Sequence, residues 1–237
     1  MTCLDCRKPE LRIESTPPPS HELDCGTPGA SLSREYERRK RNRETRVRQA
    51  HPRIGGLILA LGGAPQHESA FHRGDLGEKA VAASLETRTE GGPTITLHNR
   101  RMPNGWGDID HIAIAPTGVY VIDTKDWKGK VEVVRPWFGA AKLLINRRDC
   151  TELLDGLERQ MAAVGAVLDR EGRGAIPTQG ALCFTRADLP WLRTQELRGH
   201  LLLYPRALAK RLNAEGPLTA VEIETVARQL AAALPAA

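Results

Sequence analysis

The spacing of apolar residues changes along the chain from a helical to an alternating pattern. Residues 72–89 place Leu, Ala and Val at intervals of three to four, which is typical of an amphipathic helix, and the "EGGP" that follows predicts its end. Residues 94–100 and 108–125 alternate apolar with other residues, as half-buried strands do. The second stretch is broken by "APTG", which predicts a tight hairpin. Residues 130–134 and 141–146 are predicted as two further strands, which gives a largely antiparallel sheet after a helix.

The helical period returns after residue 150. An apolar stripe runs through residues 151–170, and Asp149 with Glu152 three residues later predicts a capping box at its start. Two short apolar runs, residues 180–185 and 200–205, predict buried strands. This second half therefore adds a helix and two strands to the sheet.

Two helices are predicted to close the chain, residues 205–216 and 218–234, the second capped by Thr219 with Glu222. The order of helix, antiparallel meander, helix, strand, strand and helices predicts an α/β sandwich. Apolar residues make up 41% of the chain and charged residues 27%, which suits a globular protein with an aliphatic core. The longest apolar run, residues 54–63, is too short to span a bilayer, and the first residues lack the apolar centre of a signal peptide. We therefore expect a cytoplasmic protein without a membrane partner.

Composition divides the chain into four parts. Clusters of Pro, Ser and Gly predict an irregular tail, a basic stretch free of Pro and Gly predicts a helix, a linker follows, and the remainder forms the main domain. The predicted parts are the tail 1–31, the basic helix 32–52, the linker 53–69 and the main domain 70–237. A chain of 237 residues suits one main domain with a small appendage.

The positive charge of the chain belongs to the basic helix. Residues 34–53 have a local charge of +6, whereas the whole chain has +5, so the remainder is slightly acidic. Ser31 or Ser33 is expected to cap this helix, and Pro52 to stop it. The helix is either a solvated face whose Glu residues pair internally or a surface that grips nucleic-acid phosphates. The residues predicted for that contact are Arg38, Arg39, Lys40, Arg41, Arg43 and Arg46.

Five cysteines, an odd number without dense spacing, favour reduced thiols over a disulfide framework. Cys3 and Cys6 form a CxxC pair, which is half of a zinc site, and His21 and Cys25 are candidates for the other two ligands. Two alternatives stay open, namely a tail that binds no metal and a partner CxxC located before residue 1.

Three ionisable residues interrupt the apolar faces of the predicted hairpin. Residues two apart on a strand project to the same side, so Asp123 and Lys125 lie side by side. If the turn sets Ala115 opposite Gly118, Asp110 falls opposite Asp123, with Cβ atoms about 5 Å apart. Two close carboxylates repel each other unless a cation lies between them, and Mg²⁺ prefers such oxygen ligands. The pattern predicts a metal site with a lysine that either stabilises negative charge developing on a phosphate or orients the nucleophile.

The stretches "GDLGEKAV", "DIDHIAIAPTGVYVIDTK" and "RQMAAVGAVL" together resemble the nuclease-related domain, NERD, a branch of the PD-(D/E)xK restriction-endonuclease-like superfamily. The resemblance covers residues 72–185, with the motifs in the expected order. It implies a restriction-endonuclease-like sandwich whose central sheet is mixed but largely antiparallel and is flanked by helices.

The resemblance also implies a role for each matched residue. Asp110 is the central metal ligand, Asp123 the second ligand and Glu78 the acidic residue of the first helix, which also faces the metal. Lys125 is the catalytic lysine, and Gln160 lies near the site. Most family members have Glu where this chain has Asp123, and the shorter side chain shifts the metal by about one methylene. Asp108 occupies a variable position and ranks below Asp110.

Simpler interpretations stay open for each of these residues. Asp123 and Lys125 also suit an exposed ion pair, which contributes about 0 to 1 kcal/mol. Glu78 alone suits a solvated helix position, and Gln160 alone suits a hydrogen bond to a backbone group. His111 points to the face opposite Asp110 by alternation, so we expect a core histidine rather than a general base.

These observations predict a nuclease, dependent on Mg²⁺ or Mn²⁺, that hydrolyses DNA in DNA processing, with RNA as the alternative substrate. The competing hypothesis is a module that keeps the nuclease fold and binds nucleic acid or a partner without cleaving. A third hypothesis is assembly through Zn²⁺ bound by the N-terminal tail.

Overall fold

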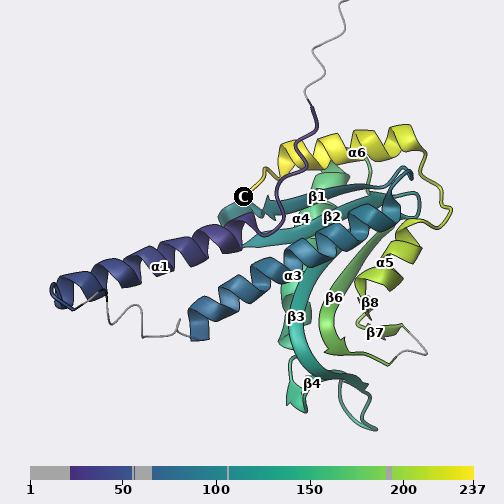
Figure 1. The fold of residues 1–237 in the computed structure, drawn as a ribbon. Coiled ribbons are helices and arrows are strands. Elements are labelled where there is room, and N and C mark those ends of the chain that lie inside the picture. Colours follow the sequence, from purple (N-terminus) through teal and green to yellow (C-terminus); the bar gives the residue numbers. More distant parts are fainter. Residues whose placement is uncertain (1–21, 55, 57–65, 106, 191–193) are drawn as a thin grey trace, which may run out of the picture.

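The computed structural model describes residues 22–54, 56, 66–105, 107–190 and 194–237 (Figure 1). Its helices are α1 (Ala30–Ala50), α3 (Gln66–Thr89), α4 (Glu152–Arg170), α5 (Pro205–Leu212) and α6 (Ala220–Ala233), with a short 3-10 helix, η1 (Pro103–Gly105). Its strands are β1 (Ile95–Arg101), β2 (Asp108–Ala115), β3 (Gly118–Val134), β4 (Lys142–Ile145), β5 (Arg148–Asp149), β6 (Thr178–Asp188), β7 (Gln195–Leu197) and β8 (His200–Leu203).

The strands form one mixed sheet in the order β1-β2-β3-β6-β8-β7, and β4 and β5 extend it from the far end of β3. The β1–β2–β3 meander and the β7–β8 pair are antiparallel, whereas β3–β6 and β6–β8 are parallel. With helices on both faces, this is the predicted α/β, restriction-endonuclease-like sandwich (Figure 1). The β3–β6 pair can be parallel because α4 carries the chain back across one face of the sheet before β6.

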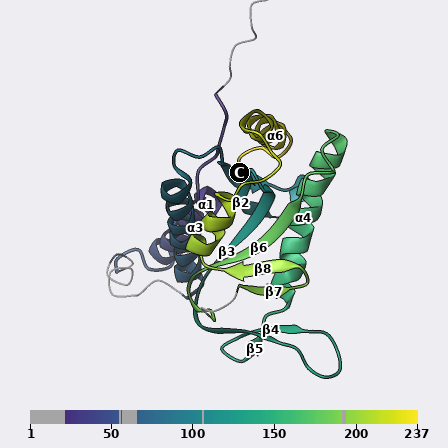
Figure 2. The same ribbon diagram turned by 90° about the vertical axis from the view of Figure 1, so that its right-hand side faces the viewer.

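Each face of the sheet has its own apolar core. Helices α4 and α6 cover one face and α3 and α5 the other (Figure 2). Alternation along β2 divides its side chains between the two cores: Ile112 and Ile114 pack with α4 and α6, and Ala113 packs with Val81 and Leu85 of α3. Two buried faces explain why β2 and the first half of β3 carry almost no exposed position.

The predicted register of the central hairpin is confirmed. Ala115 pairs with Gly118 across the turn, and the ladder continues to His111 opposite Ile122. Gly118 has a φ of +133°, and a Cβ there would lie 2.2 Å from the carbonyl oxygen of Pro177. A glycine at this position therefore lets the chain entering β6 approach the start of β3.

Three local predictions are wrong. Residues 130–134 are not a separate strand, because β3 continues through them by pairing with β6 and then with β4. Helix α4 has no capping box: the side chain of Asp149 accepts hydrogen bonds from the backbone N and Oγ1 of Thr151 instead of capping the helix. Helix α1 begins at Ala30 after Gly29, which has a left-handed conformation, so Ser31 and Ser33 lie inside the helix and do not cap it.

The start of α6 and the end of α1 are determined by the residues predicted to determine them. Thr219 and Glu222 form the predicted capping box of α6, with hydrogen bonds in both directions between side chain and backbone. Helix α1 ends at Ala50, two residues before Pro52.

Helix α3 begins at Gln66, inside the stretch predicted as a linker, most of which lies outside the described residues. Among the helices described, none combines the length and apolarity that a bilayer crossing requires.

Candidate functional site

Asp110 and Asp123 lie where β2 and β3 part. The last ladder pair of the hairpin joins His111 to Ile122, and the two aspartates follow it on their strands. The Oδ2 atom of Asp110 accepts a hydrogen bond of 2.7 Å from the backbone N of Thr124. A side chain thus takes over from the backbone ladder at this point, and it fixes one carboxylate beside the other strand.

Strand β3 has a free edge beside this pair of carboxylates. Its pairs with β2 end at Ile122 and its pairs with β4 begin at Val131, while β6 accompanies it on the other side throughout. Asn146 already bonds to the backbone of Lys128 and Lys130, so residues 123–127 of β3 are the ones that border an opening in the sheet. Asp123 and Lys125 stand on this stretch.

Lys125 is buried against Asp123. Its ammonium group donates a hydrogen bond to Oδ1 of Asp123, and the two side chains are 16% and 10% exposed. The interpretation of an exposed ion pair is therefore wrong for these two residues. An ion pair this far from water loses hydration, so its value depends on further polar partners.

Glu78 reaches the same region from α3. Its side chain is buried, and Oε2 accepts a hydrogen bond of 2.9 Å from the backbone N of Gly29, at the start of α1. Burial raises the pKa of Glu78 to about 7, and the carboxylates of Asp75 and Asp123 add to the shift. The simpler interpretation of Glu78 as a solvent-exposed helix residue is therefore wrong, because its side chain is enclosed between α1, α3 and the sheet.

The charges around Asp110 do not balance. Burial raises the pKa of Asp110 well above its usual range, and the carboxylates of Glu78 and Asp123 raise it further. Burial lowers the pKa of Lys125, but Asp123 and Asp110 outweigh this effect and raise it. One ammonium group therefore faces three acidic side chains, which cannot all ionise together unless another cation lies among them.

The cluster suits a divalent metal ion in its donors but is not a finished metal site. Its carboxylate oxygens are the hard ligands that Mg²⁺ and Mn²⁺ prefer, and the excess negative charge favours a cation. One oxygen each of Glu78, Asp110 and Asp123 is already bonded to a protein donor. Across the part of the chain that the structure describes, no three Asp, Glu, His or Cys side chains converge closely enough to hold an ion. Binding would require a local closing of these side chains.

Gln160 lies beside the first residues of β2. Its Nε2 donates a hydrogen bond of 3.4 Å to the carbonyl oxygen of Asp108, as the simpler interpretation expects. Its Oε1 is buried without a hydrogen-bond partner among the described residues. The side chain therefore has one acceptor still to satisfy, two residues along β2 from Asp110.

His111 lies on the other face of the sheet from Asp110, as predicted. It is fully buried, and its Nδ1 lies 2.9 Å from Nδ1 of His98 on β1. Burial lowers the pKa of His111 to about 3 and that of His98 to about 4, so both rings are neutral near pH 7. His111 is therefore a core residue on the α3 side of the sheet, bonded to His98 and not to the aspartates.

The segment that contains these features matches a known family. Residues 73–185 match the family model of the nuclease-related domain, NERD. The chain carries a NERD domain. It extends from α3 to β6 and includes Glu78, Asp110, Asp123, Lys125 and Gln160. No curated protein and no solved structure matches the chain.

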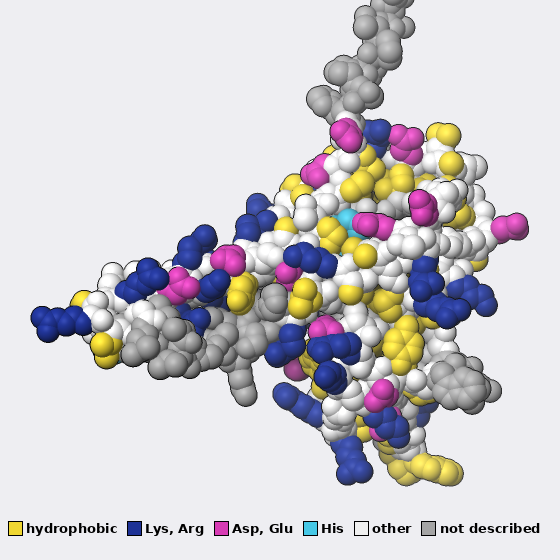
Figure 3. All heavy atoms as spheres, viewed as in Figure 1, with side chains coloured by type: hydrophobic (Ala, Val, Ile, Leu, Met, Phe, Trp, Pro, Cys, Tyr) yellow, Lys and Arg dark blue, Asp and Glu magenta, His cyan; other side chains and the backbone are white. Residues whose placement is uncertain are grey.

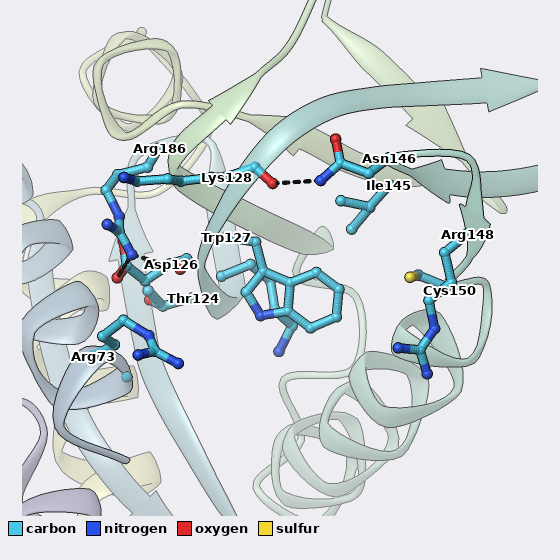
Figure 4. A pocket seen from close by; sticks show the side chains of 12 residues that line it. Arg73, Thr124, Asp126, Trp127, Lys128, Ile145, Asn146, Arg148, Cys150 and Arg186 are labelled. Atoms are coloured by element: carbon cyan, nitrogen blue, oxygen red, sulfur yellow. Dashed lines mark hydrogen bonds and ion pairs between the residues drawn. The ribbon is translucent and has the colours of Figure 1, made fainter. Parts of the chain in front are cut away.

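A cleft that the sequence analysis missed is lined by residues of the NERD domain and by Arg186, which directly follows it. It has a volume of about 820 Å³ and lies along the free edge of β3, where Thr124 and Lys125 join it to the carboxylate cluster. Its walls come from α3, from β4 and β5, and from β6 (Figure 4). The lining residues that carry its chemistry are Arg73, Lys128, Arg148, Arg186 and Trp127. The "DWK" directly after "DTK" was the available signal, but the arginines are far apart in sequence.

The predicted basic surface on α1 lies outside the NERD domain. Helix α1 packs on α3 and projects from the body of the molecule, with Lys and Arg side chains along it (Figure 3). Arg38 and Arg39 pair with Glu35 on the same helix, so part of the charge is compensated internally. No residue of α1 is buried. The six residues predicted to contact nucleic acid are therefore all at least partly exposed to solvent.

The N-terminal cysteines are mostly beyond the description. Cys3, Cys6 and His21 lie outside the described residues. Cys25 is a free thiol, partly buried against the core, and burial raises its pKa.

Proposed function

We propose that the chain is a metal-dependent nuclease that hydrolyses phosphodiester bonds of DNA. The observation that carries this proposal is the carboxylate cluster of Glu78, Asp110 and Asp123, undercompensated by Lys125, at the end of a cationic cleft. Crowding acidic side chains in a buried site costs folding free energy, and acidic groups with such perturbed pKa values are typical of catalytic sites. A cleft with four arginine or lysine side chains besides Lys125 suits a polyanionic substrate.

In the proposed mechanism, Asp110 and Asp123 would hold Mg²⁺ or Mn²⁺, and Glu78 would be a further ligand or would bond to one. The chemistry that such an ion supplies is polarisation of the phosphate and acidification of water. Lys125 stays protonated because of its carboxylate neighbours, and its ammonium group stabilises the charge that develops on the phosphate oxygens. The unpartnered Oε1 of Gln160 is an acceptor that would orient the attacking water.

The test is a cleavage assay on the full chain with supercoiled plasmid, linear DNA and RNA, in Mg²⁺, Mn²⁺ or EDTA. We expect metal-dependent cleavage by the parent and none by Asp110→Asn, which keeps an acceptor for the backbone N of Thr124. Asp108→Asn is the matched control, since it changes a carboxylate on the same strand two residues away. It should retain most of the activity.

The alternative is a nucleic-acid-binding or partner-binding module that has the fold without cleavage. If the folded parent cuts no DNA or RNA in any metal while still binding nucleic acid, the nuclease proposal fails and the alternative replaces it. Equal cleavage by the parent and Asp110→Asn would also contradict the proposal, since it would point to a contaminating enzyme or to another site.

We further propose that α1 adds phosphate contacts to this site. The contact between Gly29 and Glu78 attaches the start of α1 to the carboxylate cluster. The proposed contacts are Arg38, Arg39, Lys40, Arg41, Arg43 and Arg46. Replacing Arg41 and Arg46 together with Gln should lower the slope of log affinity against log salt by about 2 for duplex DNA. An unchanged slope would leave α1 as a solvated helix.

A further inference from the structure

The cleft beside Lys125 combines positive charge with an accessible aromatic ring. Five of its lining side chains are cationic and one, Asp126, is anionic. Asp126 is bonded to Arg186 through both carboxylate oxygens, at 2.6 Å each, so these two charges compensate each other. Among the described residues, no hydrogen bond or ion pair joins the side chains of Arg73, Lys128 and Arg148 to another side chain, although Arg73 lies close enough to Asp126 to lower the pKa of that carboxyl group. The cleft therefore keeps three cationic side chains for a ligand.

Trp127 occupies the middle of this cleft. Its indole lies between Arg73 and Arg148, which come from opposite walls (Figure 4). The side chain is 40% exposed, although a tryptophan normally gains by burial in a core. A flat aromatic face between cationic groups is the arrangement that binds a nucleotide by stacking the base and pairing the phosphates.

An irregularity of β3 puts the indole there. The register of β3 against β6 shifts between Lys125 and Lys128, so that β3 has one residue more than β6 over this interval. Such a bulge interrupts the alternation of side chains and redirects one of them. Trp127 stands in this bulge, two residues after Lys125 and on the free edge of β3. The base site would thus adjoin the site of hydrolysis.

We propose that this cleft binds single-stranded nucleic acid, with one base stacked on Trp127 and its flanking phosphates bound by Arg73, Lys128 and Arg148. In an intact duplex every base face is covered by its neighbours, so only an unpaired or unstacked base can occupy the indole. The proposal rests on the proposed nuclease function for its biological meaning. It would make single strands, frayed ends or flaps the preferred substrate over continuous duplex.

The experiment measures binding in EDTA, where no cleavage is required. The probes are a 16-nucleotide, fluorescein-labelled DNA strand of mixed sequence and the same strand in a blunt duplex. The parent should bind the single strand more tightly than the duplex. Trp127→Ala should weaken single-strand binding by about 5- to 150-fold, the range given by loss of one base stack. Trp127→Phe should restore most of it, because phenylalanine keeps an aromatic face.

The matched control is Trp137→Ala. Trp137 is 98% exposed and lies between β3 and β4, outside the lining of the cleft. This variant should bind the single strand as the parent does. Arg148→Gln should lower the salt slope for the single strand by about 0.7, the contribution of one phosphate contact. Equal single-strand affinities for the parent, Trp127→Ala and Trp137→Ala would overturn the proposal, as would a preference for the duplex.

A second readout covers the case in which Trp127→Ala does not fold. Unlabelled oligo(dT) should quench part of the tryptophan fluorescence of the parent and of Trp137→Phe, but not of Trp127→Phe. Anisotropy of a labelled probe shows when the protein is saturated with strand. If the tryptophan fluorescence of the parent is not quenched at saturation, the proposed stacking of a base on Trp127 is overturned. These measurements are made without metal, so single-strand binding can be detected even if no cleavage assay gives a product. Conversely, a nuclease that prefers duplex DNA would refute the proposed single-strand binding and leave the proposed nuclease function standing.

Discussion

Strand β3 carries two lysine–carboxylate pairs with the same spacing and opposite surroundings. Asp123 and Lys125 are two residues apart and nearly enclosed, with 10% and 16% of their side chains exposed. Lys130 and Glu132 are also two residues apart, with an ion pair of 2.7 Å, but are 68% and 35% exposed. The first pair borders the opening between β2 and β3, whereas the second stands next to the start of the β3–β4 ladder.

The difference between the two pairs comes from the neighbouring chain segments and not from their spacing. Around Asp123 and Lys125, β2 contributes Asp110 and α3 contributes Glu78, so the lysine is the counterion of several carboxylates. Among the described residues Lys130 pairs with Glu132 alone, and 68% of its side chain is exposed to solvent. An acid-x-Lys motif on a strand therefore acquires chemical meaning only where the tertiary fold removes water and adds a second acid.

The largest expected effect is on stability. Lys125→Met should lower the free energy of unfolding by about 3 to 5 kcal/mol at pH 7 in EDTA, since it leaves buried carboxylates without their counterion. Urea unfolding followed by circular dichroism measures this loss. The matched variant Lys130→Met should lose no more than about 1 kcal/mol.

Mg²⁺ sharpens the same measurement. Because a divalent cation replaces the missing charge, Mg²⁺ should stabilise Lys125→Met more than it stabilises Lys130→Met. Similar losses in the two variants, with no difference in their response to Mg²⁺, would contradict the distinction between the pairs.

The second effect is on catalysis and depends on the proposed nuclease function. Lys125→Met should slow metal-dependent cleavage by about 10² to 10³-fold, the usual loss for one donor that stabilises transition-state charge. Single-turnover rates at saturating DNA measure it, on variant protein shown to be folded. Lys130→Met should cleave at the parental rate, and an equal loss in both variants would assign the lysines to DNA binding alone.

The third expected effect is a pH dependence of stability caused by His98 and His111, a buried pair that is uncharged near pH 7. His98 and His111 have pKa values lowered to about 4 and about 3, below an ordinary value near 6.5. The unfolded chain therefore takes up protons first as the pH falls, so stability is full above pH 6.5 and declines toward pH 4. Between pH 7 and pH 5, the loss should be about 2 kcal/mol for each histidine.

His111→Asn tests this directly, because asparagine keeps a donor near the position of Nδ1 but does not titrate in this range. The loss of unfolding free energy between pH 7 and pH 5 should fall by about 2 kcal/mol in this variant. His51→Asn, which changes an exposed histidine after α1, should leave the parental loss unchanged. The same pH dependence in all three proteins would show that other groups control it.

Sequence reasoning succeeded where the determinants are local. The hairpin register follows from period-two alternation and a short turn, and it sets Asp110 and Asp123 next to each other on adjacent strands. The capping box of Thr219 and Glu222 spans three residues and was equally readable. The placement of His111 followed from the same alternation, since one step along a strand changes the face.

Sequence reasoning failed where the determinants are distant in the chain. Glu78 is held by Gly29, 49 residues away, and no spacing rule links them. The position of Trp127 depends on a bulge that arises from pairing with β6, and alternation would have assigned it to a regular face. The burial of Lys125 likewise depends on packing, which is why the sequence left the alternative of an exposed ion pair open and the structure excludes it.

The smallest expected effect concerns the exposed pair itself. A double-mutant cycle with Lys130→Met and Glu132→Gln should give a coupling below about 1 kcal/mol at low salt. At 1 M NaCl the Debye length is about 3 Å, so this coupling should disappear. The corresponding cycle with Lys125→Met and Asp123→Asn should keep most of its coupling at 1 M NaCl, because ions do not enter the buried site. A coupling of equal size and equal salt dependence in the two cycles would mean that β3 presents one kind of ion pair twice.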